Sequence, residues 1–272
     1  MSSQNRRTFI KNATALTMLG VLPGKGFLDF SEWSAQKGLL RIIIGSDSHY
    51  GQPNTAFEEM TSTFVNKANR FAQSHPCDFC VINGDLIHDD PKWMPEVKSV
   101  YDGLDIPYYV TKGNHDRVSD RRWEEIWQMP TNLSFVKKKT GFILANTSNE
   151  KGEYLMPDLA WLKKQLDQFS NLKTVVLIIH IPQASWTANG IDSPEFFNLL
   201  GQYNNIKAVF HGHEHDQDGV RVHQDIPYIF DSHIGGSWGT DYRGFRVLEI
   251  SKKGELLTYL MNPDEEMGRV RF

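Results

Sequence analysis

Short apolar runs alternate with longer amphipathic segments along most of the chain, and this alternation predicts strands and helices in turn. The apolar runs predict strands at residues 39–45, 79–82, 106–110, 174–179 and 206–210. Apolar positions at helical spacing predict helices at residues 55–74, 91–103, 120–127, 157–169 and 194–203. Two adjacent strands are expected at residues 134–138 and 142–147, joined by a turn at Thr140-Gly141.

The C-terminal part of the chain has a different pattern, in which short strands follow one another. These strands are expected at residues 220–223, 226–230, 243–250 and 255–260. Alternating strands and helices with a β-rich tail indicate mixed sheets covered by helices. The sequence has no internal repeat and no linker, so we expect one α/β domain over residues 39–272.

The first 26 residues have the layout of a secretory signal peptide. A basic stretch precedes a short apolar segment at residues 13–22, which is followed by Pro23-Gly24. The segment Asn5-Arg6-Arg7-Thr8-Phe9-Ile10-Lys11 resembles the twin-arginine export motif. We therefore expect residues 1–26 to direct the chain to the twin-arginine export machinery. The mature protein would be periplasmic or extracellular.

Composition and charge narrow the class of protein. The 272 residues are 40% hydrophobic and 23% charged, which excludes a disordered chain. No apolar run is long enough to span a bilayer. The formal net charge of −4 would become −8 once the four basic residues of the signal segment are removed, and this disfavours nucleic acid as a partner. Cys77 and Cys80 are expected to be packing residues, because an extended strand holds them too far apart for a disulfide.

Polar clusters rich in Asp, Asn and His follow five of the predicted strands. The clusters are Asp47-Ser48-His49, Gly84-Asp85, Gly113-Asn114-His115-Asp116, His180 and Gly212-His213-Glu214-His215. Ligands of open α/β sheets bind beyond the carboxyl ends of the strands, so these side chains are expected to converge. Carboxylate, amide and imidazole groups together indicate a site for Mn, Fe, Zn or a similar ion.

The spacing of these clusters closely resembles that of the calcineurin-like metallophosphoesterase superfamily over residues 47–215. The resemblance implies a four-layer sandwich of two mixed β-sheets flanked by helices, with two metal ions at the C-terminal ends of the strands. It assigns one ion to Asp47, His49, Asp85 and His215. It assigns the other to Asp85, Asn114, His180 and His213. It also makes His115 the catalytic histidine, with Asp116 orienting its ring.

The activity that the resemblance implies is hydrolysis of phosphate monoesters or diesters by a hydroxide that bridges the two ions. The alternative within the superfamily is a nuclease, since repair nucleases have a histidine at the position of His88. A solvated loop histidine is the simpler interpretation of that residue. A further alternative is a non-catalytic scaffold with the same fold, which the intact set of predicted ligands disfavours.

Other residues are candidates for positions next to the metal ions or the substrate. His211 precedes the last cluster and is expected to pack behind the ligands. Two aromatic residues and one histidine in later loops are candidates for lining the substrate pocket, although aromatic residues in loops more often serve packing. These three residues are Trp186, His233 and Trp238.

Overall fold

A computed structural model describes residue 33, residues 39–262 and residues 265–272. The strands are β1 (Leu40–Gly45), β2 (Phe79–Asn83), β3 (Tyr108–Thr111), β4 (Leu133–Lys137), β5 (Thr140–Ala145), β6 (Thr174–Ile179), β7 (Ile206–His211), β8 (Val220–His223), β9 (Ile226–Phe230), β10 (Phe245–Ile250), β11 (Leu256–Asn262) and β12 (Glu265–Arg271). The helices are α3 (Phe57–Ser74), a 3₁₀ turn η1 (Pro91–Trp93), α4 (Met94–Tyr101), α5 (Asp120–Trp127), α6 (Leu159–Gln168) and α7 (Pro194–Leu200).

The strands form two mixed six-stranded sheets that face each other. The first sheet has the order β12-β11-β10-β1-β2-β3, and the second has the order β4-β5-β6-β7-β9-β8. In the first sheet β1, β2 and β3 are parallel, while β10 joins β1 in antiparallel register. In the second sheet β5, β6, β7 and β9 are parallel. The carboxyl ends of these parallel strands point to one end of the molecule, which is where the polar clusters lie.

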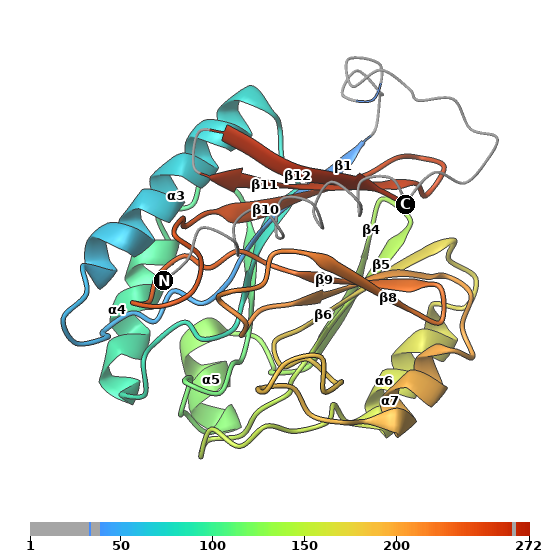
Figure 1. The fold of residues 1–272 in the computed structure, drawn as a ribbon, viewed down its shortest axis with the longest axis horizontal. Helices are drawn as coiled ribbons and strands as arrows, with labels where there is room; N and C mark the ends of the chain where they lie inside the picture. The colour runs from blue at the N-terminus through green and yellow to red at the C-terminus, as the bar shows by residue number, and fades with distance from the viewer. Residues whose placement is uncertain (1–32, 34–38, 263–264) are drawn as a thin grey trace, which may run out of the picture.

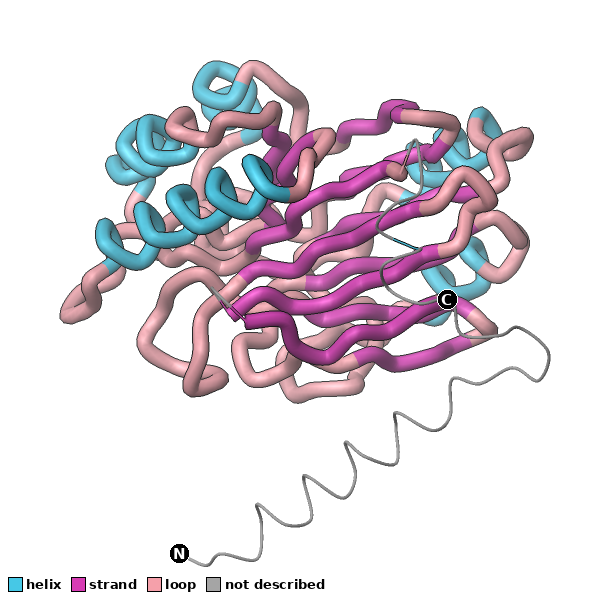
Figure 2. The backbone as a smooth tube through the Cα atoms, turned by 90° about the horizontal axis from the view of Figure 1, so that it is seen from above, coloured by secondary structure: helices cyan, strands magenta, loops and turns pink. Residues whose placement is uncertain are grey.

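Helices cover the outer faces of both sheets, so the molecule has four layers (Figures 1 and 2). One apolar cluster lies between the first sheet and α3, α4 and α5, and includes Phe64, Val97 and Trp123. A second lies between the other sheet and α6 and α7. A third fills the space between the sheets, where Ile42 and Phe210 are fully buried. This arrangement confirms the predicted four-layer sandwich.

A small hydrogen-bonded cluster on the outer face of the first sheet includes the earliest described residue of the chain. The Trp33 indole is 2% exposed and donates its Nε1–H to Glu249 Oε2 at 2.7 Å. The other oxygen of Glu249 accepts from Arg41 Nε at 2.6 Å and from Tyr259 Oη at 3.2 Å. The carboxylate is thus buried with three donors, which offset the cost of removing its charge from water.

The structure corrects two of the expected elements and adds a strand. The turn between β4 and β5 lies at Lys138 and Lys139, which have φ of 46° and 67°, and Thr140-Gly141 begins β5. Helix α6 begins after Asp158, whose side chain caps the first turn, so Pro157 precedes the helix. Strand β12 was not expected from the sequence.

The predicted signal segment, residues 1–26, lies outside the described residues. None of the described helices is both long and apolar enough to cross a membrane.

Candidate metal centre

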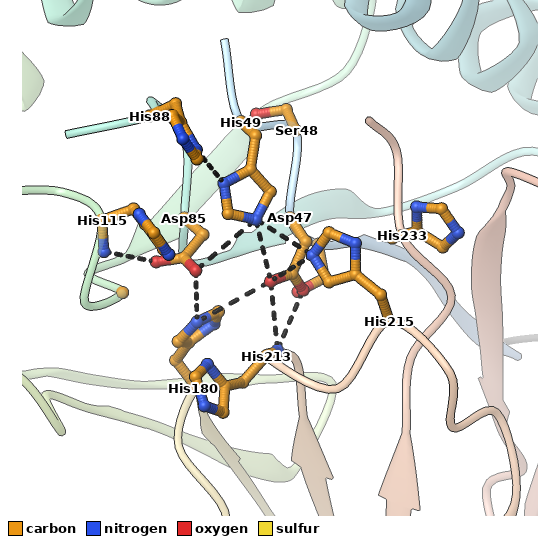
Figure 3. Close-up of polar contacts among 12 residues, drawn as sticks. Asp47, Ser48, His49, Asp85, His88, His115, His180, His213, His215 and His233 are labelled. Carbon is orange, nitrogen blue, oxygen red and sulfur yellow. Dashed lines mark hydrogen bonds and ion pairs between the residues drawn. The ribbon is translucent and has the colours of Figure 1, made fainter. Parts of the chain in front are cut away.

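Loops that follow strands of both sheets bring the predicted ligands close together. Asp47 and His49 follow β1, Asp85 follows β2, and the loops after these neighbouring strands stay hydrogen-bonded through Asp47 N–H to Gly84 O at 3.1 Å. From the second sheet, His180 follows β6 and His213 follows β7. The backbone N–H of His213 donates to Asp47 Oδ2 at 2.9 Å, which joins the two sheets at the site (Figure 3).

One group of ligand atoms consists of Asp47, His49 and His215, which are all buried. His49 Nε2 lies 2.9 Å from His215 Nε2, and His215 Nε2 lies 3.3 Å from Asp47 Oδ1. Two imidazole nitrogens that bind the same ion, each at about 2.0–2.1 Å from it, lie about 3 Å from each other. The three side chains therefore have the spacing of ligands to a single ion.

A second group consists of Asp85, His180 and His213, and it adjoins the first. His180 Nε2 lies 3.2 Å from Asp85 Oδ2, and the same oxygen lies 3.7 Å from His49 Nε2 in the first group. The Asp85 carboxylate is thus within reach of both groups, as the resemblance implies for a bridging ligand.

Unpartnered buried atoms test whether these residues fit a metal. Asn114 Oδ1 and His213 Nε2 are buried and have no hydrogen-bond partner among the described residues. Buried polar atoms are nearly always paired, and an unpaired lone pair on a nitrogen or oxygen needs an explanation. Both atoms belong to predicted ligands, so the residues present fit a metal ion.

The charge of the cluster favours a cation. Burial would lower the pKa of His180, but the Asp85 and Asp47 carboxylates outweigh burial and raise it to about 10. Burial and the charge of His180 lower the pKa of His213 to about 4, so this imidazole is neutral near pH 7. Two carboxylates that hold a proton so tightly on a buried imidazole provide the negative charge that a divalent ion requires.

The backbone around the cluster is unusual. Asp47, His49, Asp85 and His213 have φ of 56°, 43°, 50° and 71°, a region that non-glycine residues seldom adopt. Such conformations persist where the surrounding structure imposes them, and they concentrate at functional sites. Here they turn the side chains of four predicted ligands toward one another.

Most ligand histidines are held by a hydrogen bond at the ring nitrogen that faces away from the cluster. His180 Nδ1 lies 2.7 Å from Asn83 O, and His215 Nδ1 lies 3.3 Å from Trp238 O. His49 Nδ1 instead lies 3.1 Å from Nδ1 of His88. Such bonds fix which nitrogen is free to bind a metal.

The predicted catalytic histidine lies beside the cluster, but its partner differs from the expected one. His115 Nδ1 lies 3.0 Å from Asp89 Oδ1, and Arg117 Nε lies 2.8 Å from the same oxygen. The Asp116 carboxylate accepts hydrogen bonds from the backbone N–H groups of Ile87 and Gly113. The contact expected of Asp116 is thus made by Asp89, and Asp116 stabilises the loop.

Two of the other candidates lie behind the site. His211 is fully buried, its ring stacks on Tyr228, and neither ring nitrogen has a hydrogen-bond partner among the described residues. Trp186 packs against Phe197 and Tyr228 in the apolar cluster under α7. Both residues therefore serve packing, which corrects the expectation that Trp186 lines the substrate pocket.

The last two candidates lie against His215, a predicted ligand. The His233 ring stacks on it at 4.7 Å and is held by Gly235 O at 2.6 Å and Thr240 Oγ1 at 3.1 Å. The Trp238 ring stacks on it at 4.4 Å and 14°, and 43% of this side chain is exposed. Trp238 is therefore available to a molecule bound at the cluster.

Two residues at the site were not expected from the sequence. Asp89 follows His88 in a polar loop, and only its four-residue distance from Asp85 was a signal. Tyr154 lies 4.8 Å from the His213 ring in an edge-to-face contact, and 37% of its side chain is exposed. No pattern in the sequence around Tyr154 marks it.

The fold and the site define a class of protein, the two-sheet α/β metal-dependent phosphoesterases. Residues 40–217 match the family model of the calcineurin-like phosphoesterases, and the chain belongs to this family. It is thus a metal-dependent hydrolase of phosphoesters.

Curated relatives with phosphodiesterase names match large parts of the chain. A 3',5'-cyclic-nucleotide phosphodiesterase of Nostoc sp. is 25% identical over 224 residues, which cover 73% of this chain and 82% of the relative. A probable glycerophosphodiester phosphodiesterase of Arcobacter nitrofigilis is 34% identical over 158 residues, which cover 51% of this chain and 56% of the relative.

Solved structures confirm the fold. A dimetal phosphatase from Danio rerio superposes with a TM-score of 0.69 at 12% identity, covering 84% of this chain and 98% of that one. The protein GAP50 of Plasmodium, described as the anchor in the inner membrane complex, superposes with a TM-score of 0.60 at 17% identity, covering 86% and 88%.

Proposed function

We propose that this protein is an exported phosphodiesterase with two metal ions, held by the two ligand groups that share Asp85. The observation that carries the proposal is the position of Asp85 Oδ2, 3.2 Å from His180 Nε2 and 3.7 Å from His49 Nε2. Asn114 would complete the second group with its unpartnered Oδ1. When bound, such ions supply positive charge to the phosphate oxygens and lower the pKa of water.

The residues of the chain supply the proton transfer. His115 lies next to the ligands, with its ring 4.8 Å from the His49 ring, and its Nδ1 faces the Asp89 carboxylate. This contact places the proton of a neutral ring on Nδ1, so a second proton would be carried on Nε2. His115 would donate that second proton to the leaving oxygen of the ester.

Aromatic side chains beside both ligand groups favour a diester. Trp238 lies against His215 in the first group, and Tyr154 lies against His213 in the second. Leu155 and Met156, 38% and 39% exposed, continue the apolar surface from Tyr154. A phosphate with two organic substituents could place one against each aromatic residue. The names of the two curated relatives point to the same class of substrate.

The direct test compares two substrates that share a leaving group. We expect the protein loaded with Mn²⁺ or Zn²⁺ to hydrolyse bis(4-nitrophenyl) phosphate with a higher kcat/KM than 4-nitrophenyl phosphate. Faster hydrolysis of the monoester would overturn the diester preference. Cleavage of single-stranded DNA at a comparable rate would favour the nuclease alternative. Asp85→Ala is the control, because the loss of the shared carboxylate should remove bound metal and activity together.

Export is proposed from the twin-arginine motif and can be tested separately. Residues 1–38 fused to a folded reporter should direct it to the periplasm in a bacterium with a twin-arginine system. Replacing both Arg6 and Arg7 with Lys should keep the reporter in the cytoplasm. Equal export of the two fusions would contradict the proposal.

A further inference from the structure

We propose that His88 is a positioning residue, which accepts a hydrogen bond from His49 and so holds His49 with its Nε2 free for the metal. The proposal rests on the metal centre described above. Its basis is that His49 Nε2 faces the ligand group while His49 Nδ1 lies 3.1 Å from His88 Nδ1 (Figure 3).

The partner of His49 is chemically different from those of the other ligand histidines. His180 and His215 face the backbone carbonyls of Asn83 and Trp238, and a carbonyl oxygen can only accept a hydrogen bond. Those two rings must therefore carry their proton on Nδ1. An imidazole nitrogen can accept or donate, so the contact alone leaves the direction of the His49–His88 bond undetermined.

The metal determines the direction. A neutral imidazole has one N–H, and a metal bound at Nε2 requires that this proton is on Nδ1. His49 Nδ1–H then donates, and His88 Nδ1 accepts with its lone pair. The proton of His88 must lie on its Nε2. In this state His88 offers a donor to its surroundings, so it cannot act as a general base.

The backbone and a neighbouring ring hold His88 in place for this contact. Its backbone N–H donates to Tyr50 O at 2.9 Å, and its own carbonyl accepts from Asp90 N–H at 2.8 Å. Its ring lies nearly parallel to the His115 ring, at 4.8 Å and 12°. The acceptor is thus held on a fixed loop, as expected for a residue that orients a ligand.

Because His88 is a neutral acceptor, its effect on the charge of the site differs from that of a carboxylate. Ligand histidines commonly donate to a carboxylate, which makes the imidazole more basic and adds negative charge. The first ligand group already has the Asp47 carboxylate, with Asp85 adjoining it. His88 fixes the orientation of His49 without a further charge near the phosphate.

The test compares metal affinity in two variants of His88. His88→Asn keeps an acceptor, since its Oδ1 can take the place of Nδ1, whereas His88→Ala removes it. We expect zinc affinity, measured by competition with a chromophoric chelator, to fall about 10–100-fold for one equivalent in His88→Ala. His88→Asn should stay close to the unmodified protein. Equal losses in both variants, or no loss in His88→Ala, would overturn the proposal.

Two control variants distinguish the loss of the His49–His88 contact from the effect of replacing any histidine or of disturbing the loop. His75→Asn replaces an exposed histidine in the loop after α3 and should leave zinc affinity unchanged. Asp89→Asn changes the neighbouring contact to His115 but leaves the His49–His88 contact in place, so it should also bind zinc normally. A loss in Asp89→Asn equal to that in His88→Ala would assign the effect to the loop as a whole and overturn the proposal.

Nitrogen NMR of the imidazole rings tests the assignment of protons directly. In the zinc-loaded protein, His49 should be protonated at Nδ1 and His88 at Nε2. A proton on His88 Nδ1 would overturn the proposal. Neither readout involves substrate, so a protein that passes both tests but hydrolyses no phosphoester would contradict only the proposed function. A protein that hydrolyses phosphodiesters but fails both would contradict only the role of His88.

Discussion

The His115 ring is held by contacts on two sides. Asp89 lies at its Nδ1, and the parallel His88 ring covers one face. Arg117 Nε lies 2.8 Å from the same Asp89 oxygen, which restrains the carboxylate. These contacts hold the ring beside the predicted metal ligands. A ring nitrogen of His115 lies within 4.8 Å of ring nitrogens of His49 and His88, but His115 belongs neither to the group of Asp47, His49 and His215 nor to the group of Asp85, His180 and His213.

Replacing His115 should therefore separate proton transfer from metal binding. We expect His115→Ala to keep its bound metal and to lose about 10²–10⁴-fold in kcat. Asp89→Asn should lose less, because the proton donor remains while its orientation is relaxed. Elemental analysis and steady-state kinetics on the same samples provide the measurement. Turnover close to that of the unmodified protein in His115→Ala would exclude the catalytic role.

The buried side chain of His211 makes the folding stability of the protein depend on pH. Burial, and then the charge of His180, lower its pKa to about 3, compared with an ordinary value of 6.5 in the unfolded chain. Between these values the unfolded chain binds the proton and the folded protein does not, so stability falls as pH decreases from 6.5 toward 3. The contribution is about 1.4 kcal/mol for each pH unit within this window.

The variant His211→Phe removes this group while keeping an aromatic ring against Tyr228. Denaturant unfolding of the metal-free protein at pH 7 and pH 5 measures the effect. We expect the variant to lose less stability between the two pH values than the unmodified protein, by about 2 kcal/mol. An identical loss in both proteins would show that His211 binds its proton equally in the folded and unfolded states.

At the scale of elements, the loop after β3 approaches the loop after β2 unusually closely. A Cβ atom at Gly113 would lie 2.2 Å from Asp85 Oδ1 and 2.3 Å from Asp85 N. The next residue but one, His115, donates its backbone N–H to the same Asp85 oxygen at 2.8 Å. The absence of a side chain at Gly113 thus lets one loop fix the carboxylate that the other loop supplies.

Gly113→Ala should therefore disrupt the metal centre, because the clash involves the Asp85 backbone and cannot be relieved by rotating a side chain. We expect a loss of bound metal and of activity, measured by elemental analysis and by diester hydrolysis. Gly219→Ala is the matched control, since a Cβ there meets no atom within 4 Å. Normal metal content in Gly113→Ala would show that the two loops can move apart.

Elements were predicted with the right bounds where the spacing of apolar residues along the sequence follows the burial of their side chains. Strand β6 and helix α5 have the predicted bounds, because one is continuously apolar and the other has a buried stripe that includes Trp123 and Trp127. Strand β12 escaped prediction because it is polar and pairs along the edge of its sheet with β11 alone. The β4–β5 turn was misplaced because two lysines, not the adjacent glycine, adopt the left-handed conformation.

The same reasoning explains which site residues were predicted. The predicted metal ligands lie in loops that follow strands, so strand prediction and residue type were enough to expect them to converge. Asp89 and Tyr154 lie in loops, where the path of the backbone decides which side chains meet. Trp186 was misassigned for the same reason, because its loop folds back against α7.

At the scale of the whole molecule, Trp33 links the start of the domain to its last strands. It bonds Glu249 in β10, and the Arg271 guanidinium in β12 lies 5.1 Å from its ring centroid. The predicted domain begins at residue 39, but the folded structure includes Trp33. Removal of a signal segment at residue 26 would leave this contact intact.

Trp33→Ala should therefore reduce stability strongly. A buried tryptophan contributes about 3–5 kcal/mol relative to alanine, and the loss of its N–H also leaves Glu249 Oε2 without this donor. Trp238→Ala is the matched control, because 43% of that side chain is already exposed. Urea unfolding measures both. A difference of less than about 1 kcal/mol between the two variants would contradict this role for Trp33.

The position of β1 has a consequence for how the protein is made. This strand pairs with β2 on one edge and with β10 on the other, so Ile43 is matched with Val247. A growing chain on the ribosome exposes one edge of β1 until β10 has been synthesised. Pairings between such distant segments form slowly. The first sheet, and the predicted ligands that follow β1, can therefore reach their final arrangement only after residues 245–250 have been synthesised.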